Sequence, residues 1–178
     1  MGVPHMWLTK IVAKAVSGAL LALLSYSGIA SAQYVANNPL RWVDPTGLDA
    51  TVTYYQGQNG NIFGHIGIGI NTSNTIGYNP ARGVNITNVL TGQNVPSVMS
   101  PDAGHVPLKT VTIHTTPTQD QLMQNLIDQL IKNPGLYNLY NNNCTTAVQN
   151  ILAAGGISCP GTIRPKLLIY DLQEGRCK

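Results

Sequence analysis

A cysteine and a histidine carry the most specific chemical signal in the sequence. Cys144 follows Asn143 and opens the amphipathic stretch 144–154, so it is expected in the first turn of a helix. The unpaired N–H groups and partial positive charge of a helix N-terminus stabilise a thiolate, and the same N–H groups can hold an oxyanion on an attacked carbonyl. Cys144 is therefore the candidate nucleophile of a covalent mechanism.

A thiol nucleophile needs a base, and His65 is the best placed of the four histidines. A strand is expected over 62–70, with isoleucines on one face and His65 with two glycines on the other. Glycine leaves room for another element, such as a helix end, to approach the backbone closely. His65 is the candidate base, and His114, at the end of a later strand, is the alternative.

A third polar group should orient the imidazole of the base. Asn79 closes the strand that is expected to pair with the strand of His65, so it is the candidate for this role. Asn71, Asn74 and Tyr78 are alternatives.

The elements that must position these residues follow from periodicity and turn signals. Alternating, β-rich segments predict strands, helical spacing predicts a helix capped by Thr118 and a second helix, and a long loop over 79–107 is expected to hold only short strand pieces. The fold class is therefore α+β, a small antiparallel sheet packed against helices. The predicted strands are 50–56, 62–70, 75–78 and 108–114. A short extended segment is expected over 136–140, the second helix over 144–154 and an apolar tail segment over 167–172.

The first segment, 1–32, has the pattern of a secretory signal. Lys10 and Lys14 precede an apolar run, and the small-residue triplet 30–32 predicts cleavage after Ala32. The run is about ten residues, short of the ~20 that a transmembrane helix needs. An uncleaved anchor helix and an unused product of gene rearrangement are the alternatives. Export to the periplasm or medium is expected, with membrane contact through this segment only.

The cysteine count also fits export, because an oxidising compartment permits disulfides. The chain has three cysteines, so one thiol is left over in any pairing within the chain. We expect Cys159 and Cys177 to form a disulfide that holds the tail and leaves Cys144 free.

Charge and residue spacing argue against two other classes of function. The net charge is +3, and the ten Lys and Arg residues are scattered rather than clustered, so nucleic-acid binding is not expected. No cluster of His, Cys, Asp and Glu has the spacing of metal ligands, so neither a metal nor another cofactor is expected.

The turn-rich stretch 33–49 contains N-P-L-x-W-x-D-P-x-G-L at 38–48. This string resembles the end of the Rhs (rearrangement hotspot) core of polymorphic toxins, a β-cage that encloses a variable C-terminal toxin and after which the chain is cut. The resemblance implies a core-end remnant or linker at 33–49 and a toxin domain at 50–178, with a cognate immunity protein as partner. The alternative is a chance linker.

Three further motifs carry a second resemblance. G-H-I-G-I-G-I at 64–70, Y-N-P at 78–80 and Y-N-L-x-x-N-N-C-T-T-A-V at 137–148 resemble the circularly permuted papain-like superfamily, which includes NlpC-like peptidases and lecithin:retinol acyltransferase-like enzymes. The resemblance places the nucleophile on Cys144 and the base on His65, and gives no match for a third residue. Thr145 and Thr146 stand where some permuted members have an acidic residue and a histidine.

Together these features predict an antibacterial Rhs-type toxin that acts as a cysteine peptidase or amidase on cell-wall peptides. The same fold serves lipid acyl hydrolysis or transfer and protein deamidation, which are the enzymatic alternatives. A non-catalytic exported remnant or binding module is the alternative from another class.

Overall fold

A computed structural model describes residues 48–58 and 61–178 of the 178-residue chain. The chain divides into two compact units, Met1–Pro45 and Thr46–Lys178. The predicted signal segment 1–32 and most of the predicted junction 33–49 lie outside the described residues. The fold is therefore that of the second unit, which holds the predicted domain 50–178.

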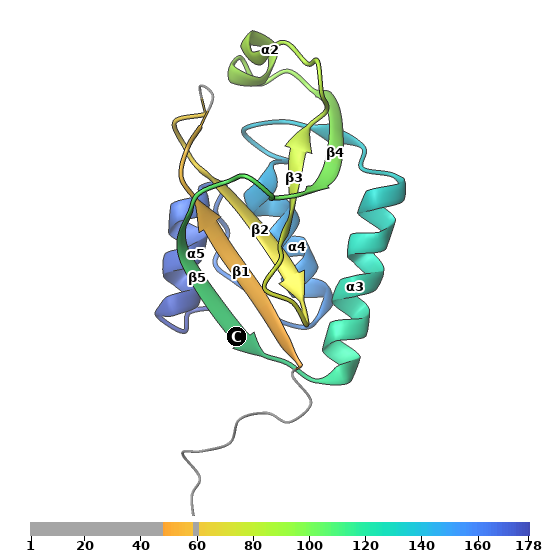
Figure 1. Cartoon of the computed structure of the whole chain (residues 1–178), viewed down its shortest axis with the longest axis vertical. Helices are drawn as coiled ribbons and strands as arrows, with labels where there is room; N and C mark the ends of the chain where they lie inside the picture. The colour runs from red at the N-terminus through yellow and green to blue at the C-terminus, as the bar shows by residue number, and fades with distance from the viewer. Residues whose placement is uncertain (1–47, 59–60) are drawn as a thin grey trace, which may run out of the picture. The chain divides into compact units, whose positions relative to one another are not determined.

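Within the described residues, six strands form one antiparallel sheet in the order β5-β1-β2-β3-β4-β6 (Figure 1). The alternating segments place β1, β2, β3 and β5 close to where the sequence predicts strands. The α+β class with an antiparallel sheet is thus confirmed. The strands are β1 Asp49–Tyr55, β2 His65–Ile70, β3 Ile76–Pro80, β4 Val95–Pro101, β5 Pro107–His114 and β6 Leu136–Tyr137.

The helices of the described part are α2 Ile86–Leu90, α3 Pro117–Lys132, α4 Cys144–Ala154 and α5 Pro165–Gln173. Helix α4 has the predicted bounds, and the apolar tail segment is helical. The predicted cap of α3, Thr118, is wrong. Thr116 caps this helix in a capping box with Gln119, because Pro117 takes the first helical position, where its missing N–H costs no hydrogen bond.

Strand β2 has one face in the apolar core and carries His65 on the other. Ile66 and Ile68 are fully buried and share one core cluster with residues of α4 such as Val148 and Ile151. Helix α4 packs against β2 and β3, and α5 lies along β1 and β5 (Figure 1). Each fully buried isoleucine contributes about 1.5–3 kcal/mol of burial free energy, so this face fixes the register of β2 and sends His65 to the other side.

The region 79–107, predicted as a long loop with strand pieces, contains α2 and the seven-residue strand β4. The last five residues of β4 pair with the whole of β3, from Ile76↔Pro101 to Pro80↔Ser97, and the first two pair with β6. Its prolines obscure the strand signal in the sequence, although alternate residues from Val95 to Met99 are buried. The strand ends directly before Asp102.

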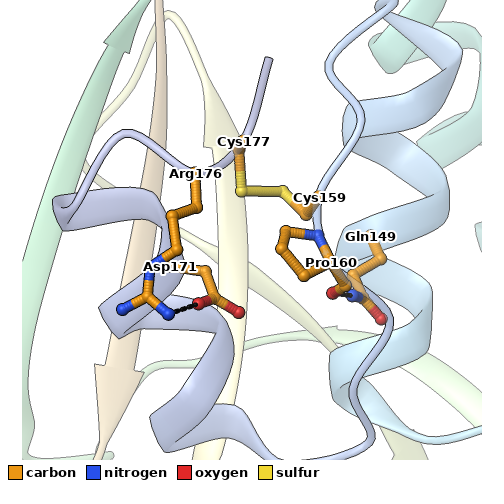
Figure 2. The surroundings of a disulfide bond; sticks show 6 residues. All are labelled: Gln149, Cys159, Pro160, Asp171, Arg176 and Cys177. Atoms are coloured by element: carbon orange, nitrogen blue, oxygen red, sulfur yellow. Dashed lines mark hydrogen bonds and ion pairs between the residues drawn. A yellow bond between two sulfur atoms is a disulfide. The ribbon is translucent and has the colours of Figure 1, made fainter.

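The C-terminal tail is fastened to the segment after α4. Cys159 and Cys177 form a disulfide, which confirms the predicted pairing, and Ser158 and Lys178 exchange two backbone hydrogen bonds of 2.7 and 2.9 Å. Figure 2 shows the disulfide beside the ion pair of Arg176 with Asp171, 3.1 Å long. Cys144 is the free, buried cysteine. None of the helices in the described part of the chain is long and apolar enough to cross a membrane.

Candidate active site

The start of α4 is built by a reciprocal cap. The side chain of Asn143 accepts hydrogen bonds from the N–H groups of Thr145 (2.9 Å) and Thr146 (3.2 Å), and the hydroxyl of Thr146 accepts one from the N–H of Asn143 (2.8 Å). Cys144 is thereby fixed as the first helical residue, and it is only 5% exposed.

This cap reduces the number of N–H groups at the helix start that are free to hold an oxyanion. The N–H groups of Thr145 and Thr146 already donate to the side-chain oxygen Oδ1 of Asn143, and the N–H of Ala147 donates to the backbone carbonyl of Asn143. Among the hydrogen bonds of the described residues, none uses the N–H of Cys144. The nucleophile's own N–H is therefore the donor that the first turn of α4 can offer.

The imidazole of His65 is held by a carboxylate. Its Nε2 lies 2.8 Å from Oδ1 of Asp102, and the two side chains are 5% and 1% exposed. Asp102 follows β4, and its backbone N–H bonds to the carbonyl of Thr75, which anchors the loop beside β2. With Nε2 engaged by Asp102, Nδ1 is the ring nitrogen left to exchange a proton with a thiol.

The second oxygen of Asp102 is also held. The hydroxyl of Thr75 donates to Oδ2 of Asp102 at 2.6 Å, and the hydroxyls of Tyr55 and Thr75 are 2.6 Å apart. Thr75 has one hydroxyl proton, and it donates this proton in its hydrogen bond to Asp102. The hydroxyl of Tyr55 is therefore the donor in the bond to Thr75. The chain of bonds runs from Tyr55 through Thr75 to Asp102, and it fixes the position of the carboxylate.

Two glycines make room for the His65–Asp102 pair. A Cβ atom on Gly67 would collide with Oδ2 of Asp102, and one on Gly77 would collide with Nε2 of His65. The glycine face predicted on β2 does allow a close approach, but the group that approaches Gly67 is the Asp102 carboxylate rather than a helix end. Both glycines are therefore steric requirements of the pair.

His65 also interacts with Cys144. Burial alone would lower the pKa of the His65 imidazole, but hydrogen bonds to Asp102 and Cys144, together with the charges of both groups, outweigh it and raise that pKa to about 9. At neutral pH His65 is largely protonated, the form that can deliver a proton to a leaving group.

Tyr137 lies beside the start of α4. Asn138 and Asn142 exchange backbone hydrogen bonds, and this closed turn brings Tyr137 opposite Asn143. Burial, with smaller contributions from the charges of Cys144 and Tyr78, raises the pKa of Tyr137 well above its ordinary value. The phenol is therefore protonated at physiological pH, and none of the hydrogen bonds of the described residues uses its hydroxyl.

Asn79, the predicted orienting residue, does not occupy that position. Its side-chain amide donates to the carbonyl of Gly77 (3.1 Å) and to the hydroxyl of Ser100 (3.2 Å), and Asp102 holds the imidazole instead. The His65 ring lies over Gly77 instead, two residues before Asn79 on β3, and meets the Asp102 carboxylate there.

The three alternatives to Asn79 are also engaged elsewhere. Asn71 accepts from the N–H of Asp49, Asn74 is exposed, and the Tyr78 hydroxyl donates to the carbonyl of Pro134. The sequence patterns do not indicate Asp102 as a site residue. Two weak signals were present, since it is one of only seven acidic residues and follows a Pro in a loop of the kind that often holds functional groups.

His114, the alternative base, lies at the other end of β1. His65 pairs with Tyr55 and His114 pairs with Asp49, so about 20 Å of strand separates the two histidines. The side chain of His114 is 79% exposed. The structure thus brings Cys144 together with His65 and not with His114.

A further histidine completes the surroundings of His65. The ring of His105 lies 5.1 Å from that of His65 and 5.6 Å from that of Tyr55, and its Nδ1 is buried without a hydrogen-bond partner in the described structure. The turn from Asp102 to His105, closed by a 3.1 Å backbone hydrogen bond, therefore supplies both the carboxylate and the second imidazole.

Comparison of the chain with protein-family models, with curated proteins and with solved structures gave no significant match. Within residues 48–58 and 61–178, no group of three or more His, Cys, Asp and Glu residues could hold a metal ion. The case for a function therefore rests on the residues of the site.

Proposed function

We propose that this chain is a cysteine hydrolase of the peptidase or amidase class, with Cys144 as nucleophile, His65 as acid and base, and Asp102 in place of Asn79 as the orienting residue. One observation carries the proposal: a buried imidazole interacts with a carboxylate and with a free thiol at a helix start. A nucleophile, a base within reach and a third group that orients the base are the parts that acyl transfer through a covalent intermediate requires.

The reaction would proceed in two halves. In the reactive form the thiol proton of Cys144 already lies on His65, which gives an imidazolium beside a thiolate, and the thiolate attacks the carbonyl carbon of an amide. The imidazolium then gives its proton to the departing amine as the C–N bond breaks, which leaves a thioester on Cys144. In the second half His65 takes a proton from water, and the hydroxide attacks the thioester. The acid is released as the C–S bond breaks, which restores the thiolate beside the protonated His65.

Two donors are available for the oxyanion of both halves. The N–H of Cys144 is free of other hydrogen bonds in the described structure, and Tyr137 lies on β6, directly before the turn that leads into α4. Because its phenol stays protonated, Tyr137 can donate at any physiological pH.

As part of the same proposal, this chemistry belongs to an antibacterial Rhs-type toxin on a permuted papain-like fold. The support is the order of His65 before Cys144, the three motifs around them and the core-end string at 38–48. The Cys159–Cys177 disulfide suits export into an oxidising compartment. Cell-wall peptides are then the substrate, and an immunity protein protects the producing cell.

The test uses the purified full-length chain with purified cell wall and, separately, phospholipid vesicles. The wild type should release soluble peptides with new amino groups from cell wall, detected by mass spectrometry. Cys144→Ala should release none while keeping the melting temperature of a folded protein. Equal release by Cys144→Ala, no release by the wild type, or hydrolysis of phospholipid alone would each overturn the proposal.

A further inference from the structure

The side chain of His105 contacts the proposed base through its ring and not through a hydrogen bond. The ring lies 5.1 Å from that of His65 at an interplanar angle of 30°, and 5.6 Å from that of Tyr55 at 55°. Its Nδ1 is buried without a hydrogen-bond partner in the described part of the chain. The reaction described above gives His105 no role, and an unpaired buried nitrogen beside the base calls for an explanation.

Burial falls from the His65–Asp102 pair to His105. The side chains of His65 and Asp102 are 5% and 1% exposed, whereas His105 is partly exposed. A partly exposed ring in contact with a buried ring covers part of the surface of the buried one. Without the His105 ring, water would therefore reach His65 from this side.

The turn that carries His105 is fixed at both of its ends. At the first end the N–H of Asp102 donates to the carbonyl of Thr75 at 3.1 Å, and the N–H of His105 closes the turn on the carbonyl of Asp102 at 3.1 Å. At the other end the N–H of Gln56, which follows β1, donates to the carbonyl of Val106 at 2.9 Å. The backbone therefore holds the His105 ring against the pair.

The titratable groups that face His65 come from three parts of the fold: Tyr55 from β1, Cys144 from α4, and Asp102 with His105 from the turn after β4. Burial lowers the pKa of the His65 imidazole, but Asp102 and Cys144 outweigh burial and raise that pKa to about 9. Interactions of this kind are strong where water is excluded and weaken where it enters. Water beside the ring should therefore move the pKa of His65 back toward its ordinary 6.5.

We propose that His105 is a positioning residue for the proposed reaction, whose ring covers the His65–Asp102 pair and keeps water away from it. The proposal rests on the proposed function, because it concerns the base that Cys144 uses. Since Nδ1 of His105 makes no hydrogen bond, the ring acts through its surface, and another ring of similar size should serve equally well.

The test follows the titration of the His65 ring by NMR in the full-length chain. The Cε1–H signal of His65 is identified by its loss in His65→Gln. In the wild type and in His105→Phe, which keeps a ring without nitrogens, this signal should titrate at about pH 9. In His105→Ala it should titrate about one pH unit lower or more, because water then reaches the ring.

Two further variants make the result specific. His105→Gln also lacks a ring and should shift the titration as His105→Ala does, so the outcome does not depend on the folding of one variant. His114→Ala removes the exposed histidine at the other end of β1 and should leave the titration of His65 at about pH 9. Melting temperatures show which variants are folded.

Three results would overturn the role of His105: a His65 titration near pH 6.5 in the wild type, an unchanged titration in the variants without a ring, or an equal shift in His105→Phe. These outcomes are distinct from failure of the proposed function. If Cys144 is required for peptide release but the variants without a ring titrate as the wild type does, only the role of His105 is wrong. If the titration shifts as expected but Cys144→Ala still releases peptides, only the hydrolase proposal is wrong.

Discussion

Two histidine–aspartate pairs stand at opposite ends of β1, and their ion-pair distances are the same. His65 and Asp102 are 2.8 Å apart with side chains 5% and 1% exposed, whereas His114 and Asp49 are 2.8 Å apart with side chains 79% and 31% exposed. In the buried pair each contact acts at a low dielectric, but water and salt screen the exposed pair.

The surroundings of the two pairs differ as well. Asp102 has Thr75 on its second oxygen, His65 interacts with Cys144, and Gly77 leaves the space that His65 fills. None of this surrounds His114, whose partner Asp49 is the first residue of β1. The same two residue types at the same distance thus form a buried pair at the proposed active site in one place and a solvated surface contact in the other.

The largest effect that should separate the pairs is on hydrolysis. Asp102→Asn removes the charge that orients and stabilises the imidazolium, and we expect a loss of activity on the order of 10³-fold or more. Asp49→Asn is the matched control and should stay within about twofold of the wild type, since exposed pairs contribute little. Cell-wall peptide release by both variants checks this. Similar losses in the two would show that burial does not distinguish the pairs.

The next effect is on the pH dependence of stability. His65 binds its proton more tightly in the folded chain, with a pKa of about 9 against an ordinary 6.5. Its contribution is therefore complete below about pH 6.5 and is lost as the pH rises through about 9, by up to about 3 kcal/mol. Urea unfolding at several pH values should show the gap between the wild type and His65→Gln narrowing over this range.

The control is His114→Gln, which removes an exposed pair and should change the free energy of unfolding by about 1 kcal/mol or less. A gap between the wild type and His65→Gln that stays constant between about pH 6.5 and about 9 would contradict the shifted titration of His65.

A smaller effect concerns the space that the buried pair needs. Gly77→Ala places a methyl group against the His65 ring, and overpacking of this kind costs about 1–3 kcal/mol of unfolding free energy. Gly161→Ala is the control, because a Cβ there meets no atom within 4 Å. Chemical denaturation measures both. A Gly77→Ala protein as stable as Gly161→Ala would mean that the pair does not depend on the glycine.

The comparison also explains how much of the site the sequence could predict. The bounds of α4 depend on the cap Asn143 and on the glycines after Ala154, which are local signals, so Cys144 could be placed at a helix start. His65 could be placed on the glycine face of its strand by alternation alone. Both predictions need only a few neighbouring residues.

Asp102 could not be found in this way. It reaches His65 across 37 positions, and only the pairing of β3 with β4 brings it there. Local patterns do not fix that register, so Asn79, which is nearer in sequence to His65, was the candidate. The exposed pair shows that a close His–Asp contact does not by itself mark a functional site. Asp49 and His114 are 65 positions apart and meet just as closely without a nucleophile.

The most direct test of the central claim, that His65 activates Cys144, is the rate at which iodoacetamide alkylates Cys144 at neutral pH, followed by mass spectrometry of the intact chain. We expect His65→Gln to slow alkylation on the order of 10²-fold, because the thiolate loses the imidazolium that stabilises it, and His114→Gln to leave the rate unchanged. Equal rates in the wild type and both variants would contradict a Cys144–His65 pair.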